Sequence, residues 1–235
     1  MSGSPKLVRG PGSLCYRLRV SRRRRSVGLT ITDTGDLVVH APPGLSLEVI
    51  HRIITKNRTW IEKKQEKCRE ALGRLEPGKV YYLGNAFRVQ VIPQGSMGIR
   101  LAQDVLRLNL ENSQADPWPQ LLGWYRREAV NLLTDKVSYF APRLGLAPPR
   151  LEVRDWRRRW GECRGDGSLR FNWRLVLLPP EIMDYVVVHE LTHLLVSGHS
   201  RDFWRHVGRC LPDFAERRRW LRIYGAPFLF WKFDL

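Results

Sequence analysis

The sequence predicts an α+β protein, with a strand-rich first half and a more helical second half. Polar and apolar residues alternate through residues 16–20, as they do in a half-buried strand. A cluster of turn-forming residues at 112–119 then precedes residues 121–140, whose apolar side chains recur every 3.6 residues. This change of period predicts two parts, the first built mainly of strands and the second mainly of helices.

The first part is expected to be a small β-rich domain over residues 14–112, preceded by a flexible tail at 1–13. Residues 27–31 and 37–40 flank a turn at 33–36 and predict a hairpin. Apolar residues at helical spacing from Leu47, with charged residues on the other face, predict one amphipathic helix that continues to Cys68. Further strands are expected at residues 80–83, 87–91, 99–101 and 105–110.

The second part is expected to be a domain over residues 113–235. Its first helix stops before Pro142, and two strands are expected around an Arg- and Gly-rich loop. Pro179 and Pro180 favour the start of an apolar helix, and Gly198 favours its end. The expected elements are a helix at 121–140, strands at 151–153 and 169–175, and helices at 182–196, 201–210 and 214–224.

Charge is the unusual property of the composition. The chain has 235 residues and a net charge of +17, and 32 of its 40 basic residues are arginine. With 43% hydrophobic residues it is typical of a globular protein, which excludes collagen, coiled coils and wholesale disorder. Such a chain attracts polyanions, so nucleic acid or a nucleotide is a possible partner. A genome that favours arginine codons is the alternative explanation.

The sequence also indicates in which cellular compartment the protein is expected. No window approaches the ~18 apolar residues of a membrane span, and the amino terminus has no apolar signal-peptide core. We therefore expect a cytoplasmic protein with no membrane partner. The four cysteines are far apart and form no C-x-x-C pair, which disfavours both a disulfide framework and a cysteine-ligated zinc site.

The pentapeptide from His189 to His193 carries the strongest chemical signal. Histidines one helical turn apart leave the same face, and Glu190 is then placed to hydrogen-bond a water molecule on a shared ion. Composition alone would produce this H-E-x-x-H pattern roughly 0.008 times in such a chain. His199, just past Gly198, can swing back as a third ligand. The motif predicts Zn²⁺ held by His189, His193 and His199, with a fourth position open for catalysis.

The alternative is that these are hydrogen-bonded core histidines without a metal. Against it, Glu190 stands between apolar neighbours, Val188 and Leu191. A buried carboxylate there would be costly without a partner such as metal-bound water.

Three segments carry a resemblance to a known family. The run from Asp184 to Trp204, the segment Arg159-Trp-Gly-Glu-Cys163 and residues 167–172 resemble the YgjP-like metallopeptidases, which are related to the SprT and WLM zinc peptidases. Nearly the whole chain is covered. Two departures concern loops: Glu162 replaces the usual Ser, and Ser197-Gly198 replaces a more typical Pro-Asn.

The resemblance implies a zincin-like catalytic domain with the H-E-x-x-H helix under a short sheet. It also implies that His189, His193 and His199 bind zinc and that Glu190 is the catalytic residue. Members of the family are described as metallopeptidases, as metal-dependent hydrolases and in places as nucleotide pyrophosphatases. The resemblance therefore leaves the substrate open.

Other candidates rank below this set. His206 could face the site, although a surface position is the simpler expectation. Tyr185, one turn before His189, is expected to be packing, and Cys163 a small buried hydrophobic residue rather than a ligand. The arginine runs at 22–25, 157–159 and 217–219 are most simply solvated surfaces. The middle run, with its neighbouring tryptophans, could instead line a groove for phosphates or bases.

Taken together, the residues predict a zinc metallopeptidase. Glu190 would take a proton from the zinc-bound water, which then attacks a substrate carbonyl. If the strand at 169–175 lies at a sheet edge, an extended polypeptide substrate could pair with it. The alternatives are a nucleotide (UTP-type) pyrophosphatase, with arginines holding the phosphates, and a nucleic-acid-binding module with structural zinc.

Overall fold

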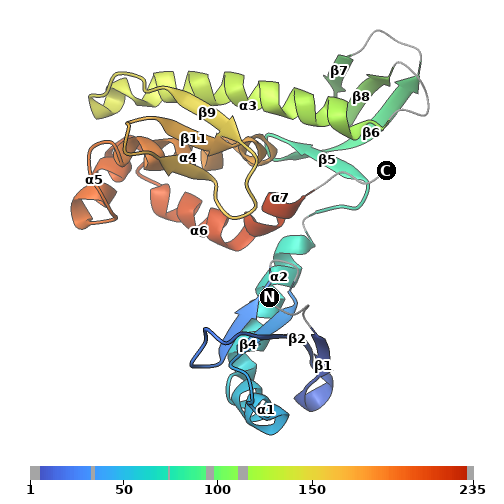
Figure 1. The fold of residues 1–235 in the computed structure, drawn as a ribbon. Helices are drawn as coiled ribbons and strands as arrows, with labels where there is room; N and C mark the ends of the chain where they lie inside the picture. Colours follow the sequence, from blue (N-terminus) through green and yellow to red (C-terminus); the bar gives the residue numbers. More distant parts are fainter. Residues whose placement is uncertain (1–5, 33–34, 74, 94–97, 111–115, 232–235) are drawn as a thin grey trace. The chain divides into compact units, whose positions relative to one another are not determined.

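Residues 6–32, 35–73, 75–93, 98–110 and 116–231 are described by a computed structural model (Figure 1). The protein has mixed α and β structure and divides into two compact units, residues 1–74 and 75–235. Each unit has its own hydrophobic core. The sequence placed the division near residue 113, and the structure differs because strands at 79–110 share the second core.

The first unit contains a four-stranded sheet. Strand β2 is parallel to β4, whereas β1 pairs antiparallel with β2 and β3 antiparallel with β4. The predicted hairpin is thus present, although residues 33–34 of its turn lie outside the described residues. In sheet order the strands are β1 (Lys6–Arg9), β2 (Cys15–Val20), β4 (Leu37–Ala41) and β3 (Gly28–Ile31).

Part of the expected tail is ordered structure. Lys6–Arg9 pairs along its length with β2, and Val8 packs against the first core. Prolines and glycines flank this short segment, and they concealed a strand of only four residues in the sequence. A 3₁₀ turn at Pro11–Ser13 follows, and residues 1–5 lie outside the described residues.

The single helix expected from Leu47 to Cys68 is two helices, α1 (Leu47–Lys56) and α2 (Arg58–Leu72). Asn57 ends α1 with a non-helical backbone, and its side-chain amide donates a hydrogen bond of 2.8 Å to the carbonyl of Ile53. Because Asn readily bonds nearby backbone groups, it can interrupt a helix without breaking the apolar pattern. Both helices bury isoleucines in the first core.

The second unit begins with another four-stranded sheet. Its strands β5 and β6 form a hairpin, β6 is parallel to β8, and β7 is antiparallel to β8. The hydroxyl of Tyr125 in α3 donates a 2.7 Å hydrogen bond to the carbonyl of Tyr81 in β5. In sheet order the strands are β5 (Lys79–Tyr82), β6 (Asn85–Pro93), β8 (Val105–Leu110) and β7 (Gly98–Ala102).

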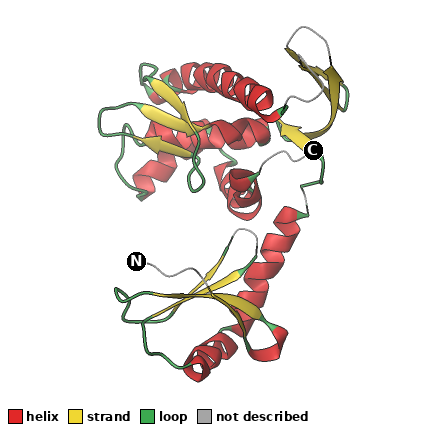
Figure 2. Cartoon of the chain, turned by 45° about the vertical axis from the view of Figure 1, so that its right-hand side comes forward, coloured by secondary structure: helices red, strands yellow, loops and turns green. Residues whose placement is uncertain are grey.

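A smaller sheet stands against the long helix α3 (Trp118–Phe140) and helix α4 (Pro180–Thr192) (Figure 2). Its order is β10 (Gly161–Cys163), β11 (Leu169–Asn172) and β9 (Leu151–Arg154). The strand expected at 169–175 ends at Asn172, because the Asn172 side chain accepts a hydrogen bond from the backbone of Arg174 and starts a 3₁₀ helix at Trp173–Leu177. The condition of an edge position for this strand is not met. β11 is the central strand and β10 lies at an edge.

Three further helices complete the second unit. The helices α5 (Arg201–Cys210) and α6 (Phe214–Tyr224) have the predicted bounds, and the short α7 (Ala226–Phe230) was not predicted. Helix α4 ends at Thr192, four residues before the predicted end, and turns follow it. None of the helices in the described ranges is both long and apolar enough to cross a membrane.

Candidate metal centre

The H-E-x-x-H motif lies at the end of α4. This helix is almost entirely buried, since its apolar residues pack into the second core on several sides. Its last turn carries His189 and Glu190, and His193 is the residue that ends the helix. Because α4 stays helical through Thr192, the two histidines lie one turn apart on one face, as their spacing predicted.

His199 reaches the same point from the loop after α4. Gly198 has a left-handed backbone (φ 75°), which reverses the chain just before His199. The Nε2 atoms of His189 and His193 are 3.3 Å apart, and those of His189 and His199 are 3.1 Å apart. Donor atoms of the three residues all lie within 4.8 Å of one another. Nitrogen ligands about 2.05 Å from a tetrahedral zinc ion are about 3.3 Å apart, so the set fits such an ion.

Electrostatics favours neutral imidazoles at His189 and His193. Burial, and then the charges of His193 and His199, lower the pKa of His189 to about 3. Burial also lowers the pKa of His193, against an opposing hydrogen bond to the carbonyl of Val196. The Nδ1 atom of His193 lies 3.4 Å from that carbonyl, so Nδ1 can carry the proton and Nε2 the free electron pair. Neutral imidazoles with inward-facing electron pairs are what a metal ion requires.

Glu190 is the acidic residue of the cluster. It is 7% exposed, and burial raises the pKa of its carboxyl group to about 7. A hydrogen bond from the Cys163 backbone lowers this pKa. The negative charge of Glu162 raises it, and the positive charge of Arg159 lowers it. The contact with Cys163 shows that the carboxyl group lies beside β10. A pKa near 7 suits a general base that works near neutral pH.

One open hollow of about 570 Å³ lies between α4 and β10, and two of the three histidines line it together with Glu190. His189, Glu190 and His193 form its floor on the α4 side. The wall on the other side comes from β10 and the loops next to it. The residues that line the hollow are Arg159, Gly161, Glu162, Cys163, Arg164, Gly165, His189, Glu190, His193, Ser197 and Gly198.

Comparison with known families identifies the chain. The profile of the YgjP-like metallopeptidase domain matches residues 25–224. The chain belongs to the YgjP-like metallopeptidase family. This family assignment, expected from the sequence motifs, makes the chain a metal-dependent hydrolase of the peptidase type. No curated protein matches the chain.

A solved structure also shows similarity, the metallopeptidase zymogen abylysin of Pyrococcus abyssi. The two chains are 26% identical over 38% of this chain and 92% of the other, with a TM-score of 0.36.

The other candidate residues of this YgjP-like metallopeptidase lie outside the histidine cluster. His206 is on α5, with Nε2 3.9 Å from a carboxylate oxygen of Asp202. Tyr185 is buried, and its ring centre lies 5.8 Å from that of His189. Cys163 lines the hollow, but burial and then Glu190 and Asp166 raise the pKa of its thiol. In the described part of the chain, only the three histidines form a group of potential metal ligands.

Two features of the site were not singled out in the sequence. Gly161 lies directly against the Glu190 side chain. Phe203 and Trp204 of α5 stand against the histidines: the Phe203 ring centre is 4.6 Å from that of His193, and Trp204 stacks on His199 at 5.7 Å. The Phe-Trp pair four and five residues after His199 was a usable signal, because a helix beginning at Arg201 brings both rings back toward the loop.

Proposed function

We propose that this YgjP-like metallopeptidase is a zinc-dependent peptidase in which His189, His193 and His199 bind the ion and Glu190 is the general base. The observation that carries the proposal is the convergence of the three Nε2 atoms, with separations of 3.1 and 3.3 Å, beside a buried carboxyl group. A purely structural zinc site needs no such carboxyl group, and it normally has four protein ligands.

When bound, zinc supplies a Lewis acid that lowers the pKa of water to about 7 and polarises a carbonyl group. Glu190 then acts on protons. It accepts one from the attacking water and can deliver it to the amine that leaves when the peptide bond breaks. Glu190 follows His189 on α4 and is not among the residues that would hold the ion, so its carboxylate would be free to exchange protons beside it.

The edge strand β10 is suited to hold an extended polypeptide. The hydrogen bonds from Asn172 N to Trp160 O (2.8 Å) and from Arg164 N to Ser168 O (2.9 Å) set the pairing between β10 and β11. In such an antiparallel pair, the backbone groups of Gly161 and the carbonyl of Cys163 point away from β11, toward the open edge, while the Cys163 N–H on that side bonds the Glu190 carboxyl group. A substrate strand can therefore add to β10 above the histidines, in place of the pairing expected at 169–175.

Nucleoside triphosphate hydrolysis is the second candidate. It is supported by four arginines that line a neighbouring hollow, because guanidinium groups bind phosphates in a bidentate manner. One screen separates the candidates. The protein is stripped with a chelator, reloaded with zinc, and incubated with unfolded polypeptides and with nucleoside triphosphates.

We expect cleavage of polypeptide that disappears with the metal and returns with zinc. Triphosphate hydrolysis without polypeptide cleavage would overturn the peptidase proposal in favour of the second candidate. No turnover of either substrate class, with zinc bound, would favour a nucleic-acid-binding module with structural zinc.

A further inference from the structure

A second hollow adjoins the candidate metal centre. It has a volume of about 410 Å³ and is built mainly by the loop between β9 and β10. Two of its residues, Arg159 and Glu162, also line the hollow next to His189 and His193. One extended molecule can therefore occupy both. The residues that line the second hollow are Trp156, Arg157, Arg158, Arg159, Glu162 and Arg170.

The four arginines of this hollow differ in their pairing. Arg159 forms an ion pair with Glu162, and Arg170 forms one with Glu152 at 3.1 Å. Arg157 and Arg158 have exposed side chains and make no ion pair within the described ranges. Two guanidinium groups are thus available to an incoming anion.

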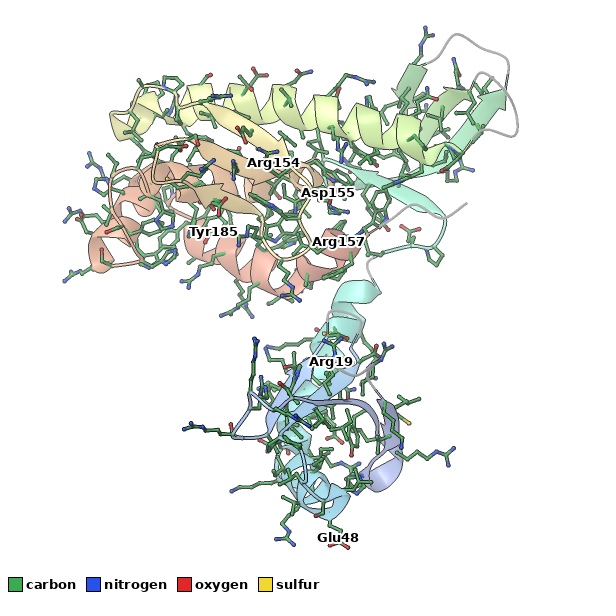
Figure 3. All side chains as sticks on the ribbon, viewed as in Figure 1. Arg19, Glu48, Arg154, Asp155, Arg157 and Tyr185 are labelled. Carbon is green, nitrogen blue, oxygen red and sulfur yellow. The ribbon has the colours of Figure 1, made fainter. Side chains whose placement is uncertain are left out.

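Buried polar groups hold the loop that carries these arginines. Asn172, which is 0% exposed, donates hydrogen bonds from Nδ2 to the carbonyls of Trp156 (2.8 Å) and Arg159 (2.9 Å). Arg174, only 1% exposed, forms an ion pair with Asp155 at the start of the same loop. Figure 3 labels Asp155 and Arg157 on this segment. The loop is therefore fixed at both ends.

This anchoring matters because three consecutive arginines repel one another. A free loop would move the side chains apart in solvent, whereas a fixed loop keeps their positive charges around one hollow. Preorganised cations bind an anion with less loss of conformational freedom. Hence the hollow has both the charge and the rigidity of an anion-binding site.

We propose that this second hollow is a specificity subsite for a carboxylate group of the polypeptide substrate, with Arg157 and Arg158 as the residues that bind it. The proposal rests on the proposed peptidase function. A single carboxylate suits the available charge better than a triphosphate does, because Glu162 lines the hollow and two of the four arginines are already paired. Glu162 is also the middle residue of β10, so a peptide along that strand passes both hollows.

The carboxylate can be an acidic side chain or the carboxyl terminus of the peptide. The test begins with cleavage sites mapped on an unfolded polypeptide. Peptides around one site are then made in matched pairs: Glu or Gln at each position near the scissile bond, and a free or amidated carboxyl terminus. Values of kcat/KM are compared for the wild type, Arg157→Gln/Arg158→Gln and the control Arg219→Gln/Arg222→Gln, which removes two exposed arginines of α6 outside both hollows.

Wild type and control should cleave the carboxylate-bearing member of one pair about tenfold faster than its neutral partner, the usual effect of a hydrogen bond to a charged group. The pair that shows the preference identifies the source of the carboxylate. In Arg157→Gln/Arg158→Gln the preference should fall to about one, while the neutral peptide is cleaved at nearly the wild-type rate. Anisotropy of the labelled peptides on the Glu190→Gln protein should show the same preference in binding.

Cleavage by the wild type with no carboxylate preference would overturn the subsite and leave the peptidase function standing. A preference that survives in Arg157→Gln/Arg158→Gln would also overturn it. If the wild type cleaves no peptide at all, the proposed function fails, and the binding measurement alone then decides whether the hollow selects carboxylates.

Discussion

The backbone of Gly161 lies so close to the side chain of Glu190 that a Cβ atom on Gly161 would be 2.6 Å from both Cγ and Oε1 of Glu190. No real Cβ contact is this short, so the carboxyl group occupies space that only glycine leaves free. Strand β10 can therefore pack this closely against the Glu190 side chain of helix α4 only because residue 161 is a glycine. The glycine sets the position of the group that we propose as the base.

This contact predicts the effect of Gly161→Ala. The added methyl group should displace the Glu190 carboxyl group and lower kcat by about 10²-fold, within the usual range for loss of a general base. Zinc content should remain near one per chain, since no histidine moves. Gly165→Ala is the matched control, because Gly165 lines the same hollow with nothing within 4 Å of an added Cβ. Equal activity of the two variants would contradict the proposed position of the base.

Metal content tests the three histidines. His189→Ala and His193→Ala should each lose most of their zinc, because each deletes one of three convergent nitrogen donors. His206→Ala should keep it. Elemental analysis after dialysis against a weak chelator gives the zinc content of each variant. Full zinc in both His189→Ala and His193→Ala would mean that the ion binds elsewhere.

The ion pair between Arg174 and Asp155 predicts a stability change. Arg174 is almost completely buried, so Asp155→Asn leaves its charge without a partner. Because the Asp155 side chain is 37% exposed and solvent screens the pair, we expect a loss of about 1 to 2 kcal/mol in the free energy of unfolding. Urea denaturation of wild type and variant at neutral pH measures this difference.

The same pair predicts a pH dependence. Burial opposes ionisation of Asp155, but its hydrogen bond and ion pair with Arg174 outweigh burial and lower the pKa of Asp155. A lowered pKa contributes stability above the unfolded value, about 3.9, and this contribution disappears as the pH falls through the lower folded value. The difference between wild type and Asp155→Asn should thus be constant above pH 5 and shrink toward pH 2. A difference that grows on acidification would contradict the ion pair.

The basic charge predicts binding to nucleic acid that depends on salt. Residues 1–74 contain sixteen basic and six acidic residues, and Arg22, Arg23, Arg24 and Arg25 are all exposed. Affinity for single-stranded DNA should fall steeply as salt rises, because each phosphate contact releases counterions. Replacing these four arginines by Gln should flatten the slope, whereas Arg219→Gln/Arg222→Gln should not. No binding at 50 mM salt would leave codon usage as the explanation of the charge.

Local patterns predicted much of the second unit. The helices α3, α5 and α6 follow directly from apolar periodicity, and residues four apart on one helix bring His189 and His193 together wherever the helix packs. Gly198 marked the turn that returns His199. The bounds of α5 and α6 agree with those expected, and Ser200 caps α5 by accepting a hydrogen bond from the backbone N–H of Phe203.

Features that depend on distant partners were not predictable. β10 has only three residues and no alternation, and its place at the sheet edge follows from pairing with β11. The division at residue 74 depends on Val80 and Leu106 sharing one core with residues of α3, which no local pattern encodes. The contact between Gly161 and Glu190 joins residues 29 positions apart and likewise appears only in the folded chain.

The turnover of Glu190→Gln at equal zinc content is the measurement that tests the central claim most directly. Glutamine keeps the size of Glu190 but cannot accept the proton, and Glu181→Gln, at the exposed start of the same helix, is the matched control. The account predicts zinc content and thermal stability near wild type in both variants. It also predicts that kcat/KM on an unfolded polypeptide falls by about 10² to 10⁴ only in Glu190→Gln. Cleavage by zinc-loaded Glu190→Gln at the rate of Glu181→Gln would contradict the account.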